Sequence, residues 1–183
     1  MKPFLIGALL AFAMVHPASA REGQKIAVAL AVDSGAIMQV GDDGTGVAAL
    51  EGMKLDEPTP WVRSVAMHFT NGKYDWAKGE KSVSLRGDAT SEEPDPVVPG
   101  QIRFAFRKIG DSDERLLVIA NGYDRALVYR AQIRVKGEDR YTDVCMVPPG
   151  THAFEHWPYA SDRILMADFR LEAWTKGQTP RCE

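Results

Sequence analysis

Apolar and polar residues alternate with a period of two in three separate segments, and this pattern constrains the fold more than any other feature. In residues 101–107, Ile102, Phe104 and Phe106 fall on one face. Residues 126–135 and 163–171 alternate in the same way. The apolar residues that share a face in these two segments are Leu127, Tyr129, Ala131, Ile133 and Val135, and Leu165, Ala167, Phe169 and Leu171. Such alternation is typical of half-buried strands.

Shorter apolar runs predict further strands. They lie at residues 25–32, 36–40, 61–69, 81–86, 115–120 and 141–147. Asn121-Gly122 between two of the runs predicts a hairpin turn, and residues 46–55 allow at most a short helix. Roughly eight or nine strands predict an all-β antiparallel sandwich, with an immunoglobulin-like arrangement favoured and a small β-barrel as the alternative.

The first twenty residues have the three zones of a secretory signal peptide. Lys2 is followed by an apolar run at residues 4–15, by Pro17, and by the small-x-small motif Ala18-Ser19-Ala20. The apolar run is shorter than the about 20 residues of a bilayer-spanning helix, so cleavage is favoured over an uncleaved anchor. We therefore expect residues 21–183 to be periplasmic or secreted, without a transmembrane segment. They should form a single domain with a long proline-rich loop near residues 87–100.

Charge and cysteine content narrow the class of protein further. The formal net charge is −3, without a basic run, which argues against a nucleic-acid partner. In an oxidising compartment the two cysteines, Cys145 and Cys182, predict a disulfide. No nucleotide-binding fingerprint occurs, and we expect no cofactor.

The C-terminal part contains a set of short motifs: Asn121-Gly122-Tyr123-Asp124, Leu127-Val128-Tyr129-Arg130-Ala131, Asp143-Val144-Cys145, Glu155-His156-Trp157-Pro158-Tyr159 and a cysteine near the C-terminus. With these motifs the chain resembles a group of uncharacterised exported bacterial β-sandwich proteins. The resemblance covers residues 116–182 and implies the fold, but no activity.

An apolar run leads into Asp33-Ser34-Gly35-Ala36. This segment resembles the active-site loop of retropepsin-like aspartic proteases, in which the aspartate shares a proton with its symmetry mate in a dimer. The resemblance implies Asp33 as the catalytic carboxylate and Ser34 as a bracing hydroxyl. The apolar-apolar-Gly segment that such proteases also need is matched best at residues 118–122, which lead into another strand. Asp and Gly are also typical turn residues, so a turn is favoured and the protease is an alternative.

Residues 152–156 spell the H-x-x-E-H motif of inverted zincins, with His152, Glu155 and His156 as potential metal-binding residues. That motif needs a helix, so that both histidines share a face. Prolines shortly before and after it leave too little room for one. A tight inter-strand loop is favoured, and a periplasmic zinc or copper carrier that uses His152 and His156 is a further alternative.

Taken together, these patterns predict an exported binding or structural module of the cell envelope rather than an enzyme. The partner would be a protein or a small molecule of unknown identity. Residues 150–160 are the candidate binding loop, because they combine polar groups with aromatic rings, which recognition surfaces favour. The candidate binding residues are His152, Glu155, His156, Trp157 and Tyr159.

Overall fold

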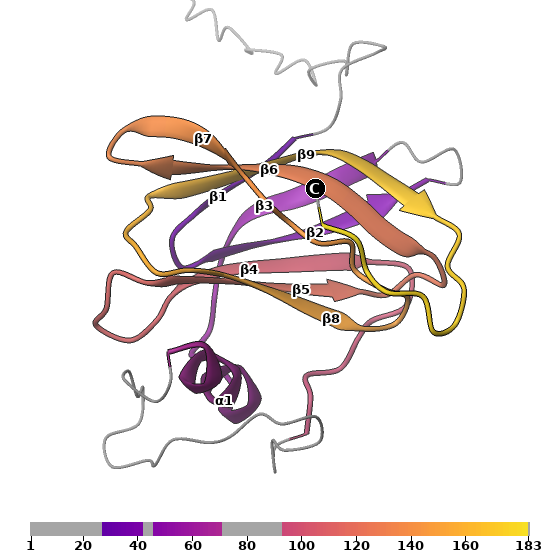
Figure 1. Ribbon diagram of the computed structural model, residues 1–183, viewed down its shortest axis with the longest axis horizontal. Coiled ribbons are helices and arrows are strands. Elements are labelled where there is room, and N and C mark those ends of the chain that lie inside the picture. Colours follow the sequence, from indigo (N-terminus) through magenta and orange to yellow (C-terminus); the bar gives the residue numbers. More distant parts are fainter. Residues whose placement is uncertain (1–26, 42–45, 71–92, 183) are drawn as a thin grey trace, which may run out of the picture.

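Two antiparallel sheets pack face to face in the computed structural model, which describes residues 27–41, 46–70 and 93–182 (Figure 1). The four-stranded sheet has the order β1 (Val28–Ala31), β9 (Arg163–Glu172), β6 (Ala126–Val135) and β7 (Glu138–Thr142). The five-stranded sheet has the order β3 (Gly46–Lys54), β2 (Ser34–Val40), β4 (Ile102–Lys108), β5 (Arg115–Asn121) and β8 (His152–Trp157). The predicted all-β antiparallel sandwich is confirmed.

The core between the sheets follows the predicted alternation in β4 and β6. Ile102, Phe104 and Phe106 of β4 are buried in the core. Leu127, Tyr129, Ala131 and Ile133 of β6 meet them from the other sheet. Arg103 and Arg130 lie on the opposite faces and are exposed. The period of two in the sequence therefore predicts both strands correctly, together with the face that each of them buries.

The alternation predicted for β9 is wrong in its first half, because the strand contains a bulge. Ile164 and Met166 are buried, instead of Leu165 and Ala167, whereas Phe169 is buried as predicted. The register with β6 shifts between Val128 and Arg130, and Asp168 adopts a left-handed φ of 58°. An extra residue at a bulge inverts the side to which later side chains point.

Residues 61–69, predicted as a strand, lie in a helix, α1 (Pro60–Phe69). Thr59 caps its N-terminus by accepting a hydrogen bond from the Val62 N–H at 3.2 Å, and Pro60 occupies the first turn, where proline is tolerated best. Trp61, Val62, Val65 and Ala66 form one apolar face, as expected for residues one turn apart.

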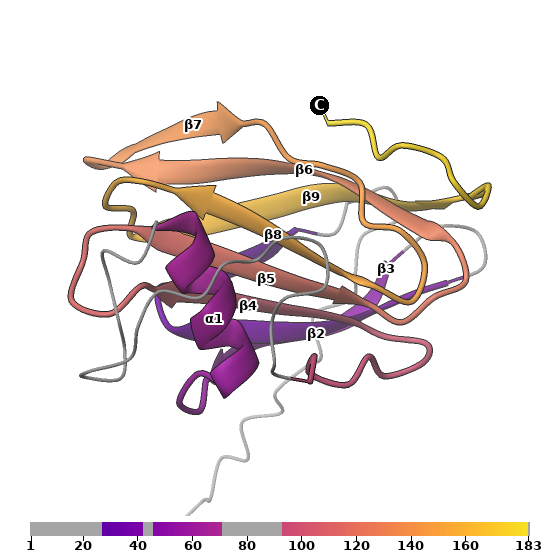
Figure 2. The same cartoon turned by 60° about the horizontal axis from the view of Figure 1, so that its bottom comes forward.

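The helix lies across the outer face of the five-stranded sheet, over β4, β5 and β8 (Figure 2). Its apolar face packs on Leu116 and Val118 of β5 and on Phe154 of β8. Because Leu117 and Ile119 face the sandwich core, all seven residues of β5 are buried. This sheet is therefore covered on both faces where the helix lies.

Several other sequence predictions are corrected. Residues 46–54 form strand β3 instead of a short helix. Strand β7 begins at Glu138 and ends at Thr142, so most of residues 141–147 lies outside it. Residues 152–157 do not form the predicted loop. They pair with β5 and form strand β8. The turn at Asn121-Gly122 joins β5 to β6, which belong to different sheets, and so is not a hairpin.

Two structural expectations about the remaining chain can be compared with the described residues. The predicted disulfide between Cys145 and Cys182 is present and joins the C-terminal segment to the connection after β7. Residues 93–101 run outside helices and strands. The predicted signal peptide, the predicted strand at 81–86 and residues 87–92 lie outside the described residues. Among the helices described, none has the length and apolarity needed to cross a membrane.

Candidate functional site

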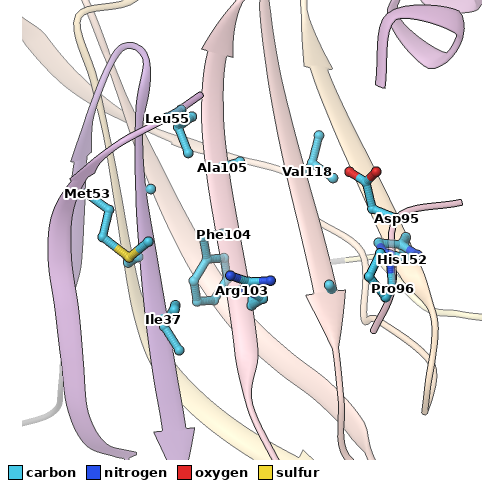
Figure 3. Close-up of a pocket in the computed structure, with 13 residues that line it drawn as sticks. Ile37, Met53, Leu55, Asp95, Pro96, Arg103, Phe104, Ala105, Val118 and His152 are labelled. Carbon is cyan, nitrogen blue, oxygen red and sulfur yellow. The ribbon is translucent and has the colours of Figure 1, made fainter. Parts of the chain in front are cut away.

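A cleft opens on the outer face of the five-stranded sheet, beside α1 (Figure 3). Its volume is about 160 Å³. The floor follows two cross-strand rows, in which each residue pairs with the next: Gly35, Ala105 and Val118 in one row, and Ile37, Arg103, Ala120 and His152 in the other. The remaining lining residues are Ala36, Met53, Leu55, Asp95, Pro96 and Phe104.

The hollow exists because small residues occupy its floor. Gly35, Ala105 and Ala120 present no side chain longer than a methyl group, so neighbouring strands leave open space above them. A Cβ atom added at Gly35 would lie 2.7 Å from Leu55 Cδ2 and 2.8 Å from the Phe104 carbonyl oxygen. Gly35 thereby lets the Leu55 side chain close over the β2 end of the floor.

The turn after β5 holds the segment that borders the cleft on its β8 side. Gly122 exchanges backbone hydrogen bonds of 2.8 Å with Gly100 and Gln101. A Cβ atom at Gly122 would lie only 1.8 Å from the Val98 carbonyl oxygen, so this approach requires glycine. The buried Asn121 amide donates to the carbonyls of Arg125, Val147 and Pro148. The Asn-Gly motif therefore fixes the backbone that follows Asp95 and Pro96.

The cleft combines apolar side chains with two opposite charges. Neither Arg103 nor Asp95 makes a hydrogen bond or ion pair with another residue in the described part of the chain. Asp95 lies beside His152, as Figure 3 shows. Burial lowers the pKa of His152, and the Asp95 carboxylate opposes this effect. The imidazole is therefore neutral at pH 7, and Arg103 and Asp95 are the charged groups that line this cleft.

A second, polar hollow of about 290 Å³ lies next to the cleft and shares Leu55 with it. It contains Asp33, which has a left-handed φ of 59° in the tight turn between β1 and β2. The Asp33 carboxylate accepts a hydrogen bond of 3.1 Å from the Lys108 backbone N–H. Asp33 thus has the conformation and bonding of a turn residue, and its role in a dimeric protease stays a prediction.

Arg107 lines the second hollow. Its guanidinium donates a hydrogen bond of 2.9 Å to the Asp56 carbonyl oxygen. Burial lowers the pKa of Arg107, and the nearby carboxylates of Asp33 and Asp95 oppose this effect. Because an arginine side chain loses its proton only far above neutral pH, this guanidinium stays protonated, and the protein already engages it through the Asp56 carbonyl.

The residues of the predicted binding loop lie on both faces of β8. His152, Phe154 and His156 face α1, where the His152 and Trp61 rings are 4.5 Å apart and the His156 and Phe69 rings 5.3 Å apart. The inward residues Glu155 and Trp157 face the sandwich interior, and Tyr159 follows the strand and is exposed. Of the five predicted binding residues, only His152 lines the cleft.

The two histidines of the H-x-x-E-H motif lie apart. Four residues of extended strand separate them by about 13 Å. His156 Nε2 is 2.6 Å from Glu114 Oε2, whereas His152 packs on Trp61. Within residues 27–41, 46–70 and 93–182, no group of three or more acidic, histidine or cysteine side chains is arranged to hold a metal ion. The metal carrier stays an alternative prediction that this geometry does not support.

Comparison with known proteins adds no functional assignment. No family model, curated protein or solved structure matches the chain. The site therefore has to be interpreted from its own chemistry. The alternation in residues 101–107 predicts only that Arg103 points away from the core, and it does not reveal the cleft around this residue. The small residues Gly35, Ala105 and Ala120, each at an outward strand position, were the available signal.

Glu155 is a titratable group that points into the sandwich behind the cleft. Its Oε1 accepts a hydrogen bond of 2.8 Å from the Cys145 backbone N–H. The Tyr129 hydroxyl lies nearby without reaching hydrogen-bond geometry to any described residue. Burial raises the pKa of Glu155, although the Cys145 N–H and the Tyr129 hydroxyl oppose this effect. Burial, together with Glu155, raises the pKa of Tyr129 well above its usual value.

The raised pKa of Glu155 predicts a pH dependence of stability. The folded state holds the proton more tightly than the unfolded state, so this contribution is complete below the ordinary value of 4.5 and is lost as pH rises through the folded pKa. Glu155→Gln cannot ionise and keeps an oxygen for the Cys145 N–H. Its free energy of unfolding should therefore rise relative to wild type across that pH window. Urea unfolding between pH 3.5 and 8 measures it.

Glu51→Gln is the matched control, because it removes an exposed carboxylate from β3. A difference between Glu155→Gln and wild type that stays constant over the whole pH range would contradict the role assigned to burial.

Proposed function

We propose that this chain is an exported binding module of the cell envelope that takes a small molecule in the cleft on its five-stranded sheet. One observation carries the proposal. The cleft places Arg103, a cation with no acidic partner in the described part of the chain, among the apolar side chains of Ile37, Met53 and Leu55. Concave sites with an apolar lining and a few polar groups are the usual form of ligand pockets.

The scaffold supports this proposal. Both faces of β5 are buried, and the turn at Gly122 fixes the segment beside Asp95. A site on such strands is held more rigidly than one on loops. The disulfide is compatible with an oxidising compartment, and the N-terminal segment supports export to the periplasm or the medium. We retain the immunoglobulin-like arrangement, and membership of the group of exported proteins, as parts of this proposal.

The test is a cleft-filling substitution. Ala120 is 7% exposed and lies on the floor between Arg103 and His152. In Ala120→Leu the added carbon atoms would occupy the space above the floor. Saturation-transfer NMR would be run on wild type and variant with a panel of small neutral, anionic and cationic compounds. Compounds that bind wild type should bind the variant at least about tenfold more weakly, since an occupied pocket excludes its ligand sterically.

Ala29→Leu is the matched control, because Ala29 is exposed on β1 of the other sheet. It should leave binding unchanged. Equal binding of the panel to wild type and to Ala120→Leu would exclude the cleft as the site. If no compound in the panel binds wild type, the proposed function is overturned.

A further inference from the structure

The cleft has three chemically distinct parts that follow one another across the sheet. On the side of β2 and β3 lie Ile37, Met53 and Leu55, which are apolar. Arg103 rises from β4 in the middle, and Asp95 lies beside His152 at the β8 side (Figure 3). The order is therefore apolar, cationic and anionic, and a ligand that satisfies all three parts must carry the complementary groups in the same order.

The width of the cleft floor suits a small ligand. Arg103 and His152 both pair with Ala120, so their backbones are two strand spacings, about 10 Å, apart. The volume of about 160 Å³ compares with about 150 Å³ for an apolar cavity that holds benzene. A ligand of about the size of benzene would fill this volume, and a slightly larger one fits because the cleft is open to solvent.

We propose that the ligand is a free α-amino acid with an apolar side chain. This proposal rests on the proposed function and names its ligand class. The α-carboxylate would bind the Arg103 guanidinium, whose fork of N–H donors matches a carboxylate. The α-ammonium would bind the Asp95 carboxylate, and the side chain would lie against Ile37, Met53 and Leu55. Each part of the cleft then receives one group of the ligand.

Ligands with a single charge fit less well. A simple carboxylate would pair with Arg103 but leave the Asp95 carboxylate without a donor, and a simple amine would do the reverse. Neither Arg103 nor Asp95 forms a hydrogen bond or ion pair with another described side chain, and Arg107, whose charge the Asp95 carboxylate senses, is bonded to the Asp56 carbonyl. A free α-amino acid carries both charges on groups bonded to the same carbon atom and can satisfy Arg103 and Asp95 at once, and three points of attachment distinguish the two enantiomers.

The experiment compares L-leucine with three probes, each of which changes one feature of it: the configuration, the ammonium group or the carboxylate group. Isothermal titration calorimetry of the full processed chain would use L-leucine, D-leucine, 4-methylpentanoate, which lacks the ammonium, and 3-methylbutylamine, which lacks the carboxylate. L-leucine should bind about tenfold more tightly than either single-charge analogue, because each analogue lacks one charge-assisted hydrogen bond. One leucine enantiomer should bind more tightly than the other.

Two substitutions assign the groups. Arg103→Gln should weaken binding of leucine and 4-methylpentanoate about tenfold and leave 3-methylbutylamine unchanged. Asp95→Asn should weaken binding of leucine and of 3-methylbutylamine in the same proportion and leave binding of 4-methylpentanoate unchanged. Arg130→Gln and Asp113→Asn, which alter exposed residues away from the cleft, are the charge-matched controls. One-dimensional NMR spectra establish that each variant is folded.

The outcomes separate this proposal from the function on which it rests. If 4-methylpentanoate binds as tightly as leucine, or if Asp95→Asn leaves leucine binding unchanged, the zwitterion is overturned. The cleft remains a binding site in that case, provided that Ala120→Leu still excludes the probe. If leucine fails to bind while other compounds of the panel bind in the cleft, the ligand class is wrong. Absence of all binding overturns the function itself.

Discussion

Removing the disulfide by the double substitution Cys145→Ala/Cys182→Ala is expected to lower the free energy of unfolding by about 4 kcal/mol. The bridge closes a loop between residues separated by 37 positions in the sequence. In the chain-entropy description, the loss arises because the unfolded chain regains the freedom that this closure removes. Urea unfolding of the oxidised wild type and of the variant measures it, with the midpoint and slope fitted together.

The double substitution should loosen the attachment of the C-terminal segment to the connection after β7. Beyond the bridge, the C-terminal segment is held here by a backbone hydrogen bond of 3.0 Å from Met146 N–H to the Arg181 carbonyl. The Cys145 N–H continues to bond Glu155 in the variant. Wild type treated with a reductant should match the double variant, which serves as the internal control. A loss below about 1 kcal/mol would contradict the entropic account, since native strain would then cancel the stabilisation.

Trp61→Ala is the second change with a large expected effect, a loss of about 3 kcal/mol or more. Trp61 is 6% exposed. Its ring contacts His152 and Phe154 edge to face, with centroids 4.5 and 5.3 Å away. Truncation would remove most of the apolar contact that α1 makes with β8 and leave a cavity beside it. Thermal or urea unfolding provides the measurement.

The same substitution also tests the connection between the helix and the cleft. His152 lines the cleft and packs on Trp61, so Trp61→Ala should weaken binding of any cleft ligand in the folded protein. Trp61→Phe, which keeps an aromatic ring, should lose much less stability. If Trp61→Ala is no less stable than His68→Ala, an exposed residue of the same helix, the helix does not pack on the sheet as described.

The sequence predicted strands best where one face meets the core and the other meets solvent. In β4 and β6 the period of two is unbroken, and the predicted faces are confirmed. In β9 the bulge at Asp168 inverted the pattern, and a single apolar pattern cannot reveal an extra residue. In residues 61–69, Trp61, Val65 and Phe69 recur every four positions, which fits a helix better than a strand. Thr59 and Pro60 were the deciding signals, because they are typical of a helix N-terminus.

The cleft was less predictable than the fold, because it depends on three segments that are distant in the sequence. Its floor requires the register of β2, β4, β5 and β8, and its margins require Leu55 and Asp95. The alternation in residues 101–107 predicts only that Arg103 points away from the core. The register adds that Arg103 lies between Ile37 and Ala120 on the floor of the cleft. The motif at Asn121-Gly122 was noticed as a turn, but its contacts with Gly100 and Gln101 could not be foreseen.

An amide chemical-shift map of the protein during titration with L-leucine tests the central claim most directly. The account predicts saturable shifts confined to the backbone around Ile37, Arg103, Ala120 and His152, with no shifts on β6 and β7 of the other sheet. Shifts that cluster on the four-stranded sheet, or that leave Arg103 and Ala120 unchanged at saturation, would contradict it.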